Sequence, residues 1–326
     1  MQKIFKDKTV LITGGTGSFG SFAVNMLLKV KNIKKIIIFS RDELKQTELV
    51  KKFSATQQKK LRFFIGDVRD LSRVEMACRN VDYIIHAAAL KHVPVAEYNP
   101  FECIKTNIMG SQNVIEAALK NNVKNVIALS TDKACSPINL YGATKLCAEK
   151  LFVAANQMVG DLNVKFSVVR YGNVMGSRGS VLPFFLQTSI KNYFPITDLN
   201  MTRFNISLID AFNLVVWALK NNKGGEIFIP KLSSFKVLDL AKAINNKAKI
   251  EVIGIREGEK IHEELVSYSE INNLLDLGKN YAIILGNKKK KHLLNKKILT
   301  SYNSGTTANK LSIMDLKKIV EKNYQT

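Results

Sequence analysis

Cysteine is scarce in this chain, with four residues among 326. Neither C-x-x-C spacing nor a neighbouring histidine accompanies Cys78, Cys103, Cys135 or Cys147. This pattern argues against a zinc site or a redox-active disulfide. Histidine is equally rare, and His92 and His262 are expected to pack rather than bind metal, because no ligand cluster surrounds them. We therefore predict no metal, and reduced, mostly buried thiols.

Long apolar runs are also missing. Residues 36–39 and 83–90, the latter broken by His86, fall far short of the ~20 apolar residues that a membrane-spanning helix needs. The first strand-like segment, Thr9–Thr13, begins too close to the N-terminus to leave room for the regions of a signal peptide. We expect a cytoplasmic protein without a membrane span.

Acidic residues are few, 27 against 49 lysines and arginines, which gives a formal net charge of +22. Such a charge can bind nucleic acid by releasing counterions from phosphates. The lysines are nevertheless scattered, and no RNA-binding or helix-turn-helix signature accompanies them. We predict no nucleic-acid partner; a diphosphate ligand would gain from the same field. The four lysines at residues 288–291 are expected to form a solvated loop.

What the chain does contain is a regular alternation of short β-rich runs with longer helix-compatible segments. The β-rich runs are Thr9–Thr13, Lys35–Ser40, residues 61–66, 83–87 and 126–130, and Lys165–Tyr171. Alternation of this kind predicts an α/β fold of the Rossmann type, a doubly wound parallel sheet with helices on both faces. We assign residues 1–171 and 206–230 to this domain, the second range holding an amphipathic run, 208–220, and the strand Glu226–Pro230. Residues 172–205 and 231–326 are predicted to form a smaller, discontinuous substrate-binding domain.

A glycine-rich turn follows the first β-rich run directly and opens a helix. It reads Thr-Gly-Gly-Thr-Gly-Ser-Phe-Gly over residues 13–20. Glycine permits the tight turn and the close approach of backbone N–H groups to a pyrophosphate at the helix N-terminus. The strand-turn-helix context predicts dinucleotide binding by Gly14, Thr16, Gly17, Ser18, Phe19 and Gly20.

The second strand ends in Ser40 and Arg41, where an NAD enzyme would carry an acidic residue for the ribose 2′-hydroxyl. A guanidinium matches a 2′-phosphate, so we predict NADP as the cofactor. Asp42, one residue further on, argues in the opposite direction. An exposed surface charge is the alternative interpretation of Arg41.

The third and fourth strands end in residues that suit a bound dinucleotide. Asp67 and Val68 follow the third strand, where a carboxylate can accept a hydrogen bond from the adenine amino group. Ala87 and Ala88 follow the fourth, where small side chains let the cofactor approach the backbone. Either pair alone is compatible with an ordinary strand end. Their placement at the ends of successive strands is what indicates a cofactor site.

Reactive side chains cluster after the fifth strand. Thr131, Asp132 and Lys133 end this strand, and Tyr141 and Lys145 stand four residues apart on the next helix. That spacing puts phenol and ammonium on one helix face. A neighbouring ammonium favours the phenolate and makes Tyr141 a feasible base. Tyr-x-x-x-Lys also occurs as a packing pair on helices, but its position after a dinucleotide turn favours catalysis.

Through these motifs the chain resembles the extended short-chain dehydrogenase/reductase superfamily. Within it, the chain is similar to the inverting UDP-N-acetylglucosamine 4,6-dehydratases, which begin pseudaminic acid and related bacterial glycan pathways. The segments that carry this resemblance are residues 40–46 (SRDELKQ), 89–94 (ALKHVP), 129–133 (LSTDK), 170–174 (RYGNV), 195–198 (PITD), 201–204 (MTRF) and 254–260 (GIREGEK). Asp132-Lys133 is the most specific, since retaining dehydratases have Asp-Glu there. Beyond about residue 265 the resemblance is loose.

The resemblance implies a mechanism on UDP-N-acetylglucosamine. Tyr141 would remove the C4 hydroxyl proton while C4 hydride passes to NADP, with Thr131 bonded to the C4 oxygen. Lys133, its pKa lowered by burial and by Lys145, would act as the base at C5. Asp132 would protonate the departing C6 hydroxyl. Hydride would then return to C6, and a proton would return to C5 from the opposite face.

The resemblance also implies a set of substrate-binding residues: Lys91, Asn173, Arg178, Ser180, Val181, Thr202, Arg203, Arg256 and Glu259. Arginine suits a diphosphate because its planar fork binds two oxygens at once. We expect a homo-oligomer, either a dimer or a hexamer, although the residues themselves do not specify one.

Other functions remain open from the residues alone. A nucleotide-sugar 4-epimerase or a retaining dehydratase would keep Tyr141 and Lys145 without needing Lys133 as a base. A non-catalytic NADP-sensing module would have lost the tyrosine or the lysine, and both are present.

Overall fold

The computed structural model describes residues 1–190, 192–284 and 301–324. Within them, nine strands form one sheet, in the order β14-β15-β10-β6-β5-β4-β1-β2-β3. Seven strands run parallel, and β15 and β14 add antiparallel pairs at one edge. The strands are β1 Thr9–Thr13, β2 Lys35–Ser40, β3 Leu61–Ile65, β4 Tyr83–His86, β5 Asn125–Thr131, β6 Lys165–Tyr171, β10 Glu226–Pro230, β14 Leu274–Asp276 and β15 Asn280–Ile284. The predicted Rossmann-type sheet is confirmed.

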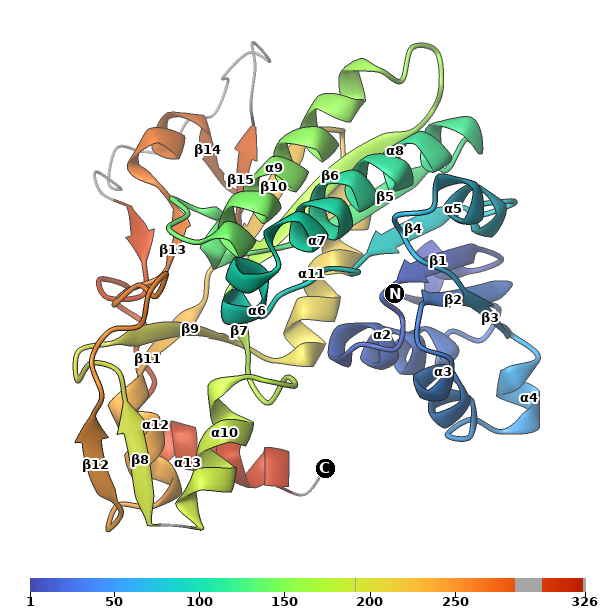
Figure 1. Ribbon diagram of the computed structural model, residues 1–326. Coiled ribbons are helices and arrows are strands. Elements are labelled where there is room, and N and C mark those ends of the chain that lie inside the picture. The colour runs from blue at the N-terminus through green and yellow to red at the C-terminus, as the bar shows by residue number, and fades with distance from the viewer. Residues whose placement is uncertain (191, 285–300, 325–326) are drawn as a thin grey trace.

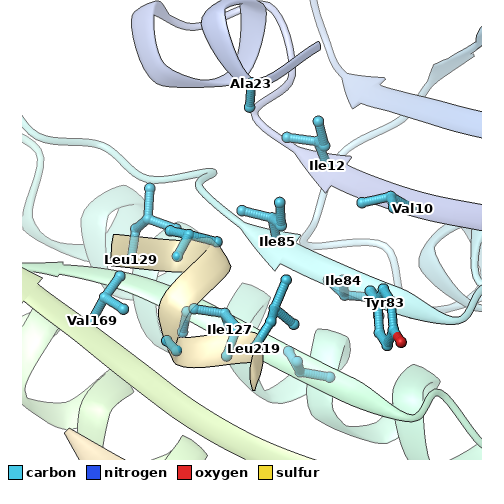
Figure 2. Close-up of a cluster of buried hydrophobic side chains, with 14 of the residues drawn as sticks. Val10, Ile12, Ala23, Tyr83, Ile84, Ile85, Ile127, Leu129, Val169 and Leu219 are labelled. Atoms are coloured by element: carbon cyan, nitrogen blue, oxygen red, sulfur yellow. The ribbon is translucent and has the colours of Figure 1, made fainter. Parts of the chain in front are cut away.

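Helices cover both faces of this sheet (Figure 1). On one face α2 (Ser18–Leu28) packs against α11 (Leu208–Asn221), and on the other α5 (Leu71–Ala77), α8 (Gly110–Lys120) and α9 (Leu140–Ala154) lie in a row. The central strands are buried along their whole length, which explains their continuous runs of Val, Ile and Leu. Figure 2 shows side chains of β1, β4, β5 and β6 meeting in this core, with Leu219 among them.

The same region holds several shorter elements. They are α1 Gln2–Phe5, α3 Glu43–Val50, α4 Ala55–Gln58, α6 Val93–Tyr98, α7 Pro100–Ile104, and the helical turns η1 Lys105–Met109, η2 Asp132–Ala134 and η3 Ala155–Gln157. No helix in the described ranges is both long enough and apolar enough to cross a membrane.

A second, smaller hydrophobic core is built around Phe185, Phe194 and Leu240. Its elements, and the strands and turns that join it to the large sheet, are β7 Asn173–Val174, α10 Val181–Ser189, β8 Tyr193–Ile196, β9 Thr202–Ile206, β11 Ser233–Lys236, α12 Val237–Ile244, β12 Lys249–Val252, β13 Glu264–Val266, η4 Tyr268–Asn273, β16 Tyr302–Asn303 and α13 Ile313–Tyr324. Figure 1 shows α10, α12 and α13 together, away from the large sheet.

The division into two domains stays a prediction. The large sheet contains one segment that the prediction assigned to the smaller domain. The strands β14 and β15 lie in a range that the sequence prediction gave to the smaller domain, yet they pair onto β10 in the large sheet. The four lysines at residues 288–291 lie outside the described residues.

Candidate functional site

A cleft of about 1130 Å³ opens at the carboxyl ends of the parallel strands, with residues of the smaller core on its far wall. Ligands of open α/β sheets bind at this edge. Every predicted cofactor residue lines the cleft: Gly14, Thr16, Gly17, Ser18, Phe19, Gly20, Ser40, Arg41, Asp67, Val68, Ala87, Ala88, Tyr141 and Lys145. The structure therefore brings together residues that lie up to 131 positions apart in the sequence, from Gly14 to Lys145.

The glycine-rich turn has the shape that a dinucleotide requires. Gly14 adopts φ +66°, and a Cβ atom there would lie 2.8 Å from the Ala88 nitrogen. The Gly17 N–H donates to the Gly14 carbonyl at 2.9 Å, which closes the turn. Among the described residues no side chain caps the N-terminus of α2. Its first N–H groups are thus available to an anion.

The ends of β2 and β3 present two cations, Arg41 and Lys45, and two carboxylates, Asp42 and Asp67, to the cleft. Arg41 is half-exposed, with Nη1 3.5 Å from Asp67 Oδ2. Asp67 is held more closely by Arg69, at 2.7 Å, and although burial raises the pKa of Asp67, these hydrogen bonds and charges bring it below its usual value. Asp42 caps α3, accepting from the Lys45 N–H at 2.9 Å and pairing with Lys45 Nζ at 2.6 Å. The carboxylate that argued against NADP is thus engaged in its own helix.

Two buried side chains that the sequence did not single out tie β1 to β4 under the cleft. The Thr13 hydroxyl accepts hydrogen bonds from the N–H groups of Ala87 and Ala88, at 3.2 and 3.3 Å. It also lies 2.8 Å from His86 Nδ1. Burial lowers the pKa of His86 to about 3, so this ring is neutral. His86 is a packing residue of the sheet.

Tyr141 and Lys145 come from the first turns of α9, which Asn139 caps by accepting from the Gly142 N–H at 2.8 Å. Burial raises the pKa of Tyr141 to about 12, and the Lys133 charge and a hydrogen bond with Thr131 only partly oppose this rise. Burial lowers the pKa of Lys145 to about 8. Its Nζ donates to the Leu129 carbonyl at 2.7 Å. The Lys133 charge thus favours the phenolate, and the predicted role of Lys145 stays a prediction.

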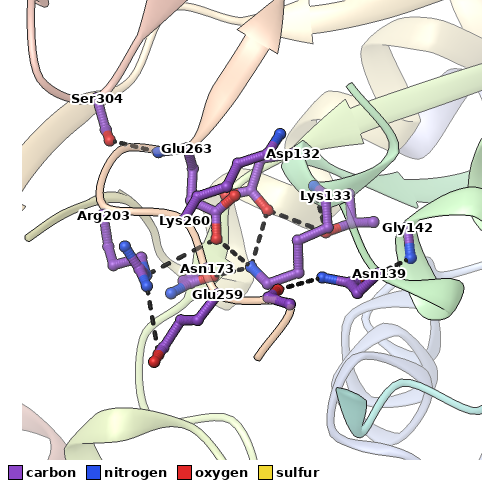
Figure 3. A network of polar contacts seen from close by, with 12 residues as sticks. Asp132, Lys133, Asn139, Gly142, Asn173, Arg203, Glu259, Lys260, Glu263 and Ser304 are labelled. Carbon is purple, nitrogen blue, oxygen red and sulfur yellow. Dashed lines mark hydrogen bonds and ion pairs between the residues drawn. The ribbon is translucent and has the colours of Figure 1, made fainter. Parts of the chain in front are cut away.

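Lys133 lies between two carboxylates (Figure 3). Its Nζ is 3.2 Å from Asp132 Oδ1 and 3.0 Å from Glu263 Oε1, and it donates to Asn173 Oδ1 at 3.4 Å. Burial lowers the pKa of Lys133, but the two carboxylates outweigh burial and raise it above its ordinary value. The expectation that the Lys133 pKa is lowered is therefore wrong, because the charge of Asp132 and that of Glu263, which the sequence did not indicate, outweigh burial.

Asp132 is fully buried behind Thr131 and Lys133 and does not itself line the cleft. Its Oδ1 accepts from the Thr131 hydroxyl at 3.0 Å, while Oδ2 has no hydrogen-bond partner among the described residues. Burial raises the pKa of Asp132 against the opposing charge of Lys133, and Glu263 adds to the rise. Asp132 therefore takes up a proton at higher pH than an ordinary aspartate does.

Most of the predicted substrate residues lie on the same cleft wall: Lys91, Asn173, Ser180, Val181, Arg203, Arg256 and Glu259. Arg203 Nη2 lies 3.5 Å from Glu259 Oε1, and its Nε lies 3.8 Å from Glu263 Oε1. Lys91 donates to the Arg178 carbonyl at 2.8 Å. Burial, and to a smaller degree the charges of Arg178 and Lys133, lower the pKa of Lys91.

Arg178 and Thr202 do not line the cleft. The Arg178 guanidinium donates to the Thr16 carbonyl at 3.2 Å, so it is bound to the glycine-rich turn. Thr202 is buried, and its hydroxyl lies 2.8 Å from His262 Nδ1 and 2.7 Å from Ser304 Oγ. Both side chains form hydrogen bonds with protein atoms, so nothing in the structure supports a direct contact of either one with the substrate.

Sequence reasoning missed Glu263 and Ser304. Glu263 lies three residues after the 254–260 segment, and no spacing rule connects it to Lys133. Ser304 comes from the region where the resemblance is loose, yet its hydroxyl accepts from the Glu263 N–H at 2.9 Å. In the part of the chain that the structure describes, no three His, Cys, Asp or Glu side chains converge as metal ligands.

Comparison with known proteins gives consistent matches. The family described as "Polysaccharide biosynthesis protein" matches residues 10–285. An inverting UDP-N-acetylglucosamine 4,6-dehydratase of Campylobacter jejuni is 55% identical over 282 residues, which are 86% of this chain and 84% of that protein. A UDP-glucose 4-epimerase of Rickettsia bellii is 48% identical over 289 residues, with the same coverage of 86% and 84%.

Two solved structures also resemble this chain. Pen from Bacillus thuringiensis is 39% identical, with a TM-score of 0.91 over 99% of both chains. DesIV, a dTDP-glucose 4,6-dehydratase of Streptomyces venezuelae solved with NAD and TYD, is 22% identical, with a TM-score of 0.69 over 78% of this chain and 86% of that one. The second likeness is one of fold.

Proposed function

Because this chain belongs to the family of polysaccharide biosynthesis proteins, we propose that it dehydrates UDP-N-acetylglucosamine across C4, C5 and C6 with inversion at C5. The product is UDP-2-acetamido-2,6-dideoxy-β-L-arabino-hexos-4-ulose. The observation that carries the proposal is the Lys133 amine at the cleft, beside Tyr141 and bonded to Asp132. The 55% identity to the C. jejuni enzyme of that name supports it.

NADP is the cofactor we propose. The glycine-rich turn, the uncapped N-terminus of α2 and the Arg41 guanidinium fit its pyrophosphate and its 2′-phosphate. Asp42 is paired with Lys45, so it does not offset the positive charge near Arg41. When bound, NADP would accept hydride from C4 and return it at C6.

The chain's own residues would supply the proton transfers. Tyr141, as the phenolate, takes the C4 hydroxyl proton while Thr131 holds the C4 oxygen. The resulting ketone acidifies the C5 hydrogen, and a neutral Lys133 removes it. Asp132 provides the proton with which the C6 hydroxyl leaves as water, either after a rotation of its side chain into the cleft or through Lys133. After hydride has returned to C6, a proton returns to C5 from the opposite face, which inverts C5. Lys91, Arg203 and Arg256 supply positive charge for the diphosphate.

The product formed in deuterated water tests this proposal. We expect NMR of the purified chain with NADP and UDP-N-acetylglucosamine to show deuterium at C5 and an L-arabino 4-keto-6-deoxy sugar nucleotide. Tyr141→Phe should abolish turnover while leaving NADP affinity nearly unchanged, because only the phenolic proton acceptor is lost. A deuterated product of D-xylo configuration would instead identify a retaining dehydratase.

A nucleotide-sugar 4-epimerase is the second candidate, favoured by the Rickettsia relatives that carry that name. An epimerase needs Tyr141 and Lys145 but no base at C5. The same NMR experiment distinguishes the two, since an epimerised sugar with its C6 hydroxyl intact would show that no dehydration occurs.

The wider setting is also a proposal. We place the reaction in the cytoplasm, in the synthesis of a bacterial surface glycan of the pseudaminic acid type, and we expect a homo-oligomer, a dimer or a hexamer. The family's description as polysaccharide biosynthesis proteins supports the glycan assignment.

A further inference from the structure

The Lys133 amine is held from two sides by carboxylates of distant parts of the chain. Asp132 precedes it at the end of β5, and Glu263 reaches it from the segment before β13. Of these, Glu263 has no role in the reaction proposed above. Figure 3 shows Glu263 and Asp132 both directed toward the Lys133 amine, with Arg203 on the far side of Glu263.

Glu263 is fixed by its surroundings. Its side chain is 3% exposed, and its main chain exchanges two hydrogen bonds with Ser304: N–H to Oγ at 2.9 Å and N–H of Ser304 to the carbonyl at 2.8 Å. The Ser304 hydroxyl is in turn bonded to Thr202 at 2.7 Å. These bonds fix the main chain that carries the carboxylate, and burial confines the side chain, so the Glu263 carboxylate defines a fixed position for the amine.

The charges around the two carboxylates differ. Glu263 faces Lys133 on η2, Arg203 on β9 and, at longer range, Lys260 of its own segment. Asp132 faces Lys133, Glu263 and the phenol of Tyr141. Burial raises the pKa of Glu263, but the cations outweigh burial and lower it, whereas the pKa of Asp132 is raised. Glu263 thus lies near two cations, Lys133 and Arg203, and Asp132 near one, so a proton binds more readily to Asp132 than to Glu263.

We propose that Glu263 is a positioning residue that holds the Lys133 amine at the cleft and keeps Asp132 as the proton-bearing carboxyl of the pair. The inference rests on the proposed function for its catalytic meaning, since Asp132 must hold a proton before the C6 hydroxyl can leave. The arrangement itself is a property of the protein and can be measured without turnover.

Glu263→Gln removes the charge and keeps the shape and the hydrogen-bond acceptor. Asp132 then becomes the sole counterion of Lys133, so its pKa should fall by about one unit or more, the usual effect of a close charge. We expect ¹³C NMR of protein labelled at Asp Cγ, with the signal assigned from Asp132→Asn, to show Asp132 titrating at lower pH in Glu263→Gln than in the wild type. In Glu263→Asp, which keeps the charge, Asp132 should titrate at nearly the same pH as in the wild type.

Glu264→Gln is the matched control, because it removes the same charge one residue further on. Within the described residues, Glu264 forms no ion pair with Lys133. It should leave the Asp132 titration unchanged. An Asp132 signal that titrates at the same pH in Glu263→Gln and in the wild type would overturn the inference.

Turnover gives a second, separate readout. Elimination needs Asp132 protonated and Lys133 neutral, so its pH optimum lies between their two pKa values. Glu263 raises both, and the optimum of Glu263→Gln should therefore move to lower pH by about one unit or more. If turnover of Glu263→Gln declines but its pH optimum does not change, Glu263 has only a structural role. If wild type forms no dehydrated product but the Asp132 titration shifts, the proposed function fails and the positioning role stands.

Discussion

Arg41 and Asp42 stand side by side at the end of β2 and carry opposite charges, yet their surroundings assign them different tasks. Asp42 is bonded to the Lys45 N–H and paired with the Lys45 ammonium. Arg41 is half-exposed on the cleft wall, and its nearest carboxylate, Asp67, is shared with Arg69. The guanidinium is thus the group at this position with capacity left for a phosphate.

Replacing Arg41 with alanine should weaken NADP binding and leave NAD binding almost unchanged. A hydrogen bond to a charged group contributes about 1.5–3 kcal/mol, so the dissociation constant for NADP should rise about 10-fold to 150-fold. Isothermal titration of both dinucleotides into wild type and variant measures this difference.

Arg79→Ala is the control, because Arg79 is exposed, lies away from the cleft and carries the same charge. Equal affinities for NAD and NADP in both wild type and Arg41→Ala would leave Arg41 an ordinary surface charge.

The residue types in the cleft were predictable because their motifs are local. The turn at residues 13–20 and the Tyr141, Lys145 pair each lie within one element, so spacing alone places their side chains together. The pKa of Lys133 was predicted in the wrong direction because Asp132 and Glu263 together outweigh burial, and Glu263 lies 130 residues later in the chain. Arg178 and Thr202 likewise make contacts with Thr16 and Ser304 that no local pattern indicates.

At the scale of elements, Arg170 joins three segments under the sheet. From β6 it binds Glu149 of α9, through Nε at 2.9 Å and Nη2 at 2.5 Å. It also binds Glu270 of η4, through Nη1 at 3.0 Å and Nη2 at 2.9 Å. Arg170 and Glu149 are fully buried. The helix that carries Lys145 and the segment that follows Glu263 are therefore fixed to the same strand.

Arg170→Met should lower the free energy of unfolding by about 3–5 kcal/mol, because it leaves two carboxylates near the core without their cation. Urea unfolding followed by circular dichroism measures the loss. Lys231→Met, which breaks an exposed pair with Asp276 of 2.8 Å, should cost about 1 kcal/mol or less. Similar losses for the two variants would contradict the argument.

The loss in Arg170→Met should also depend on pH. Burial raises the pKa of Glu270, but Arg170 outweighs burial and lowers it below 4.5, the ordinary value for glutamate. A carboxyl whose pKa is lowered by folding stabilises the protein above the unfolded pKa and ceases to do so as the pH falls through the folded pKa. The difference between wild type and Arg170→Met should therefore shrink below about pH 4.5.

The bounds of several strands of the parallel sheet were predictable from the sequence, because a buried strand appears there as a continuous apolar run between two turns. The observed β1, β2, β6 and β10 have the predicted bounds. The antiparallel edge was not predicted. β14 and β15 are short, and their place depends on pairing with β10, about 50 residues earlier in the chain, which the pattern of a single segment does not specify.

At the scale of the whole molecule, the two hydrophobic cores share parts of the chain. The strand β9 contributes Phe204 and Ile206 to the large core, while it pairs through its backbone with β11, whose Phe235 lies in the small core. The chain also passes from the small core into β14 and β15 of the large sheet and then returns in α13. Neither core can lose its structure without disturbing strands of the other.

We therefore expect both cores to unfold in one transition. Trp217, the sole tryptophan, packs edge-on against Phe228 in the large core, with ring centroids 5.1 Å apart, and its fluorescence reports that core. Hydrogen-exchange mass spectrometry of peptides from α12, pulsed at increasing urea concentration, reports the small core. The two midpoints should coincide; an earlier midpoint for α12 would show that the small core unfolds independently.

The discontinuity of the small core also limits how such a protein can exchange parts with its relatives. Residues of that core come from three stretches of sequence, 175–201, 235–248 and 316–320, with strands and helices of the large core between them. A single genetic crossover would split the core instead of transferring it, and its new half would meet unmatched side chains. We therefore expect substrate preference on this scaffold to diverge by point substitutions along the cleft wall, because such substitutions leave both hydrophobic cores intact.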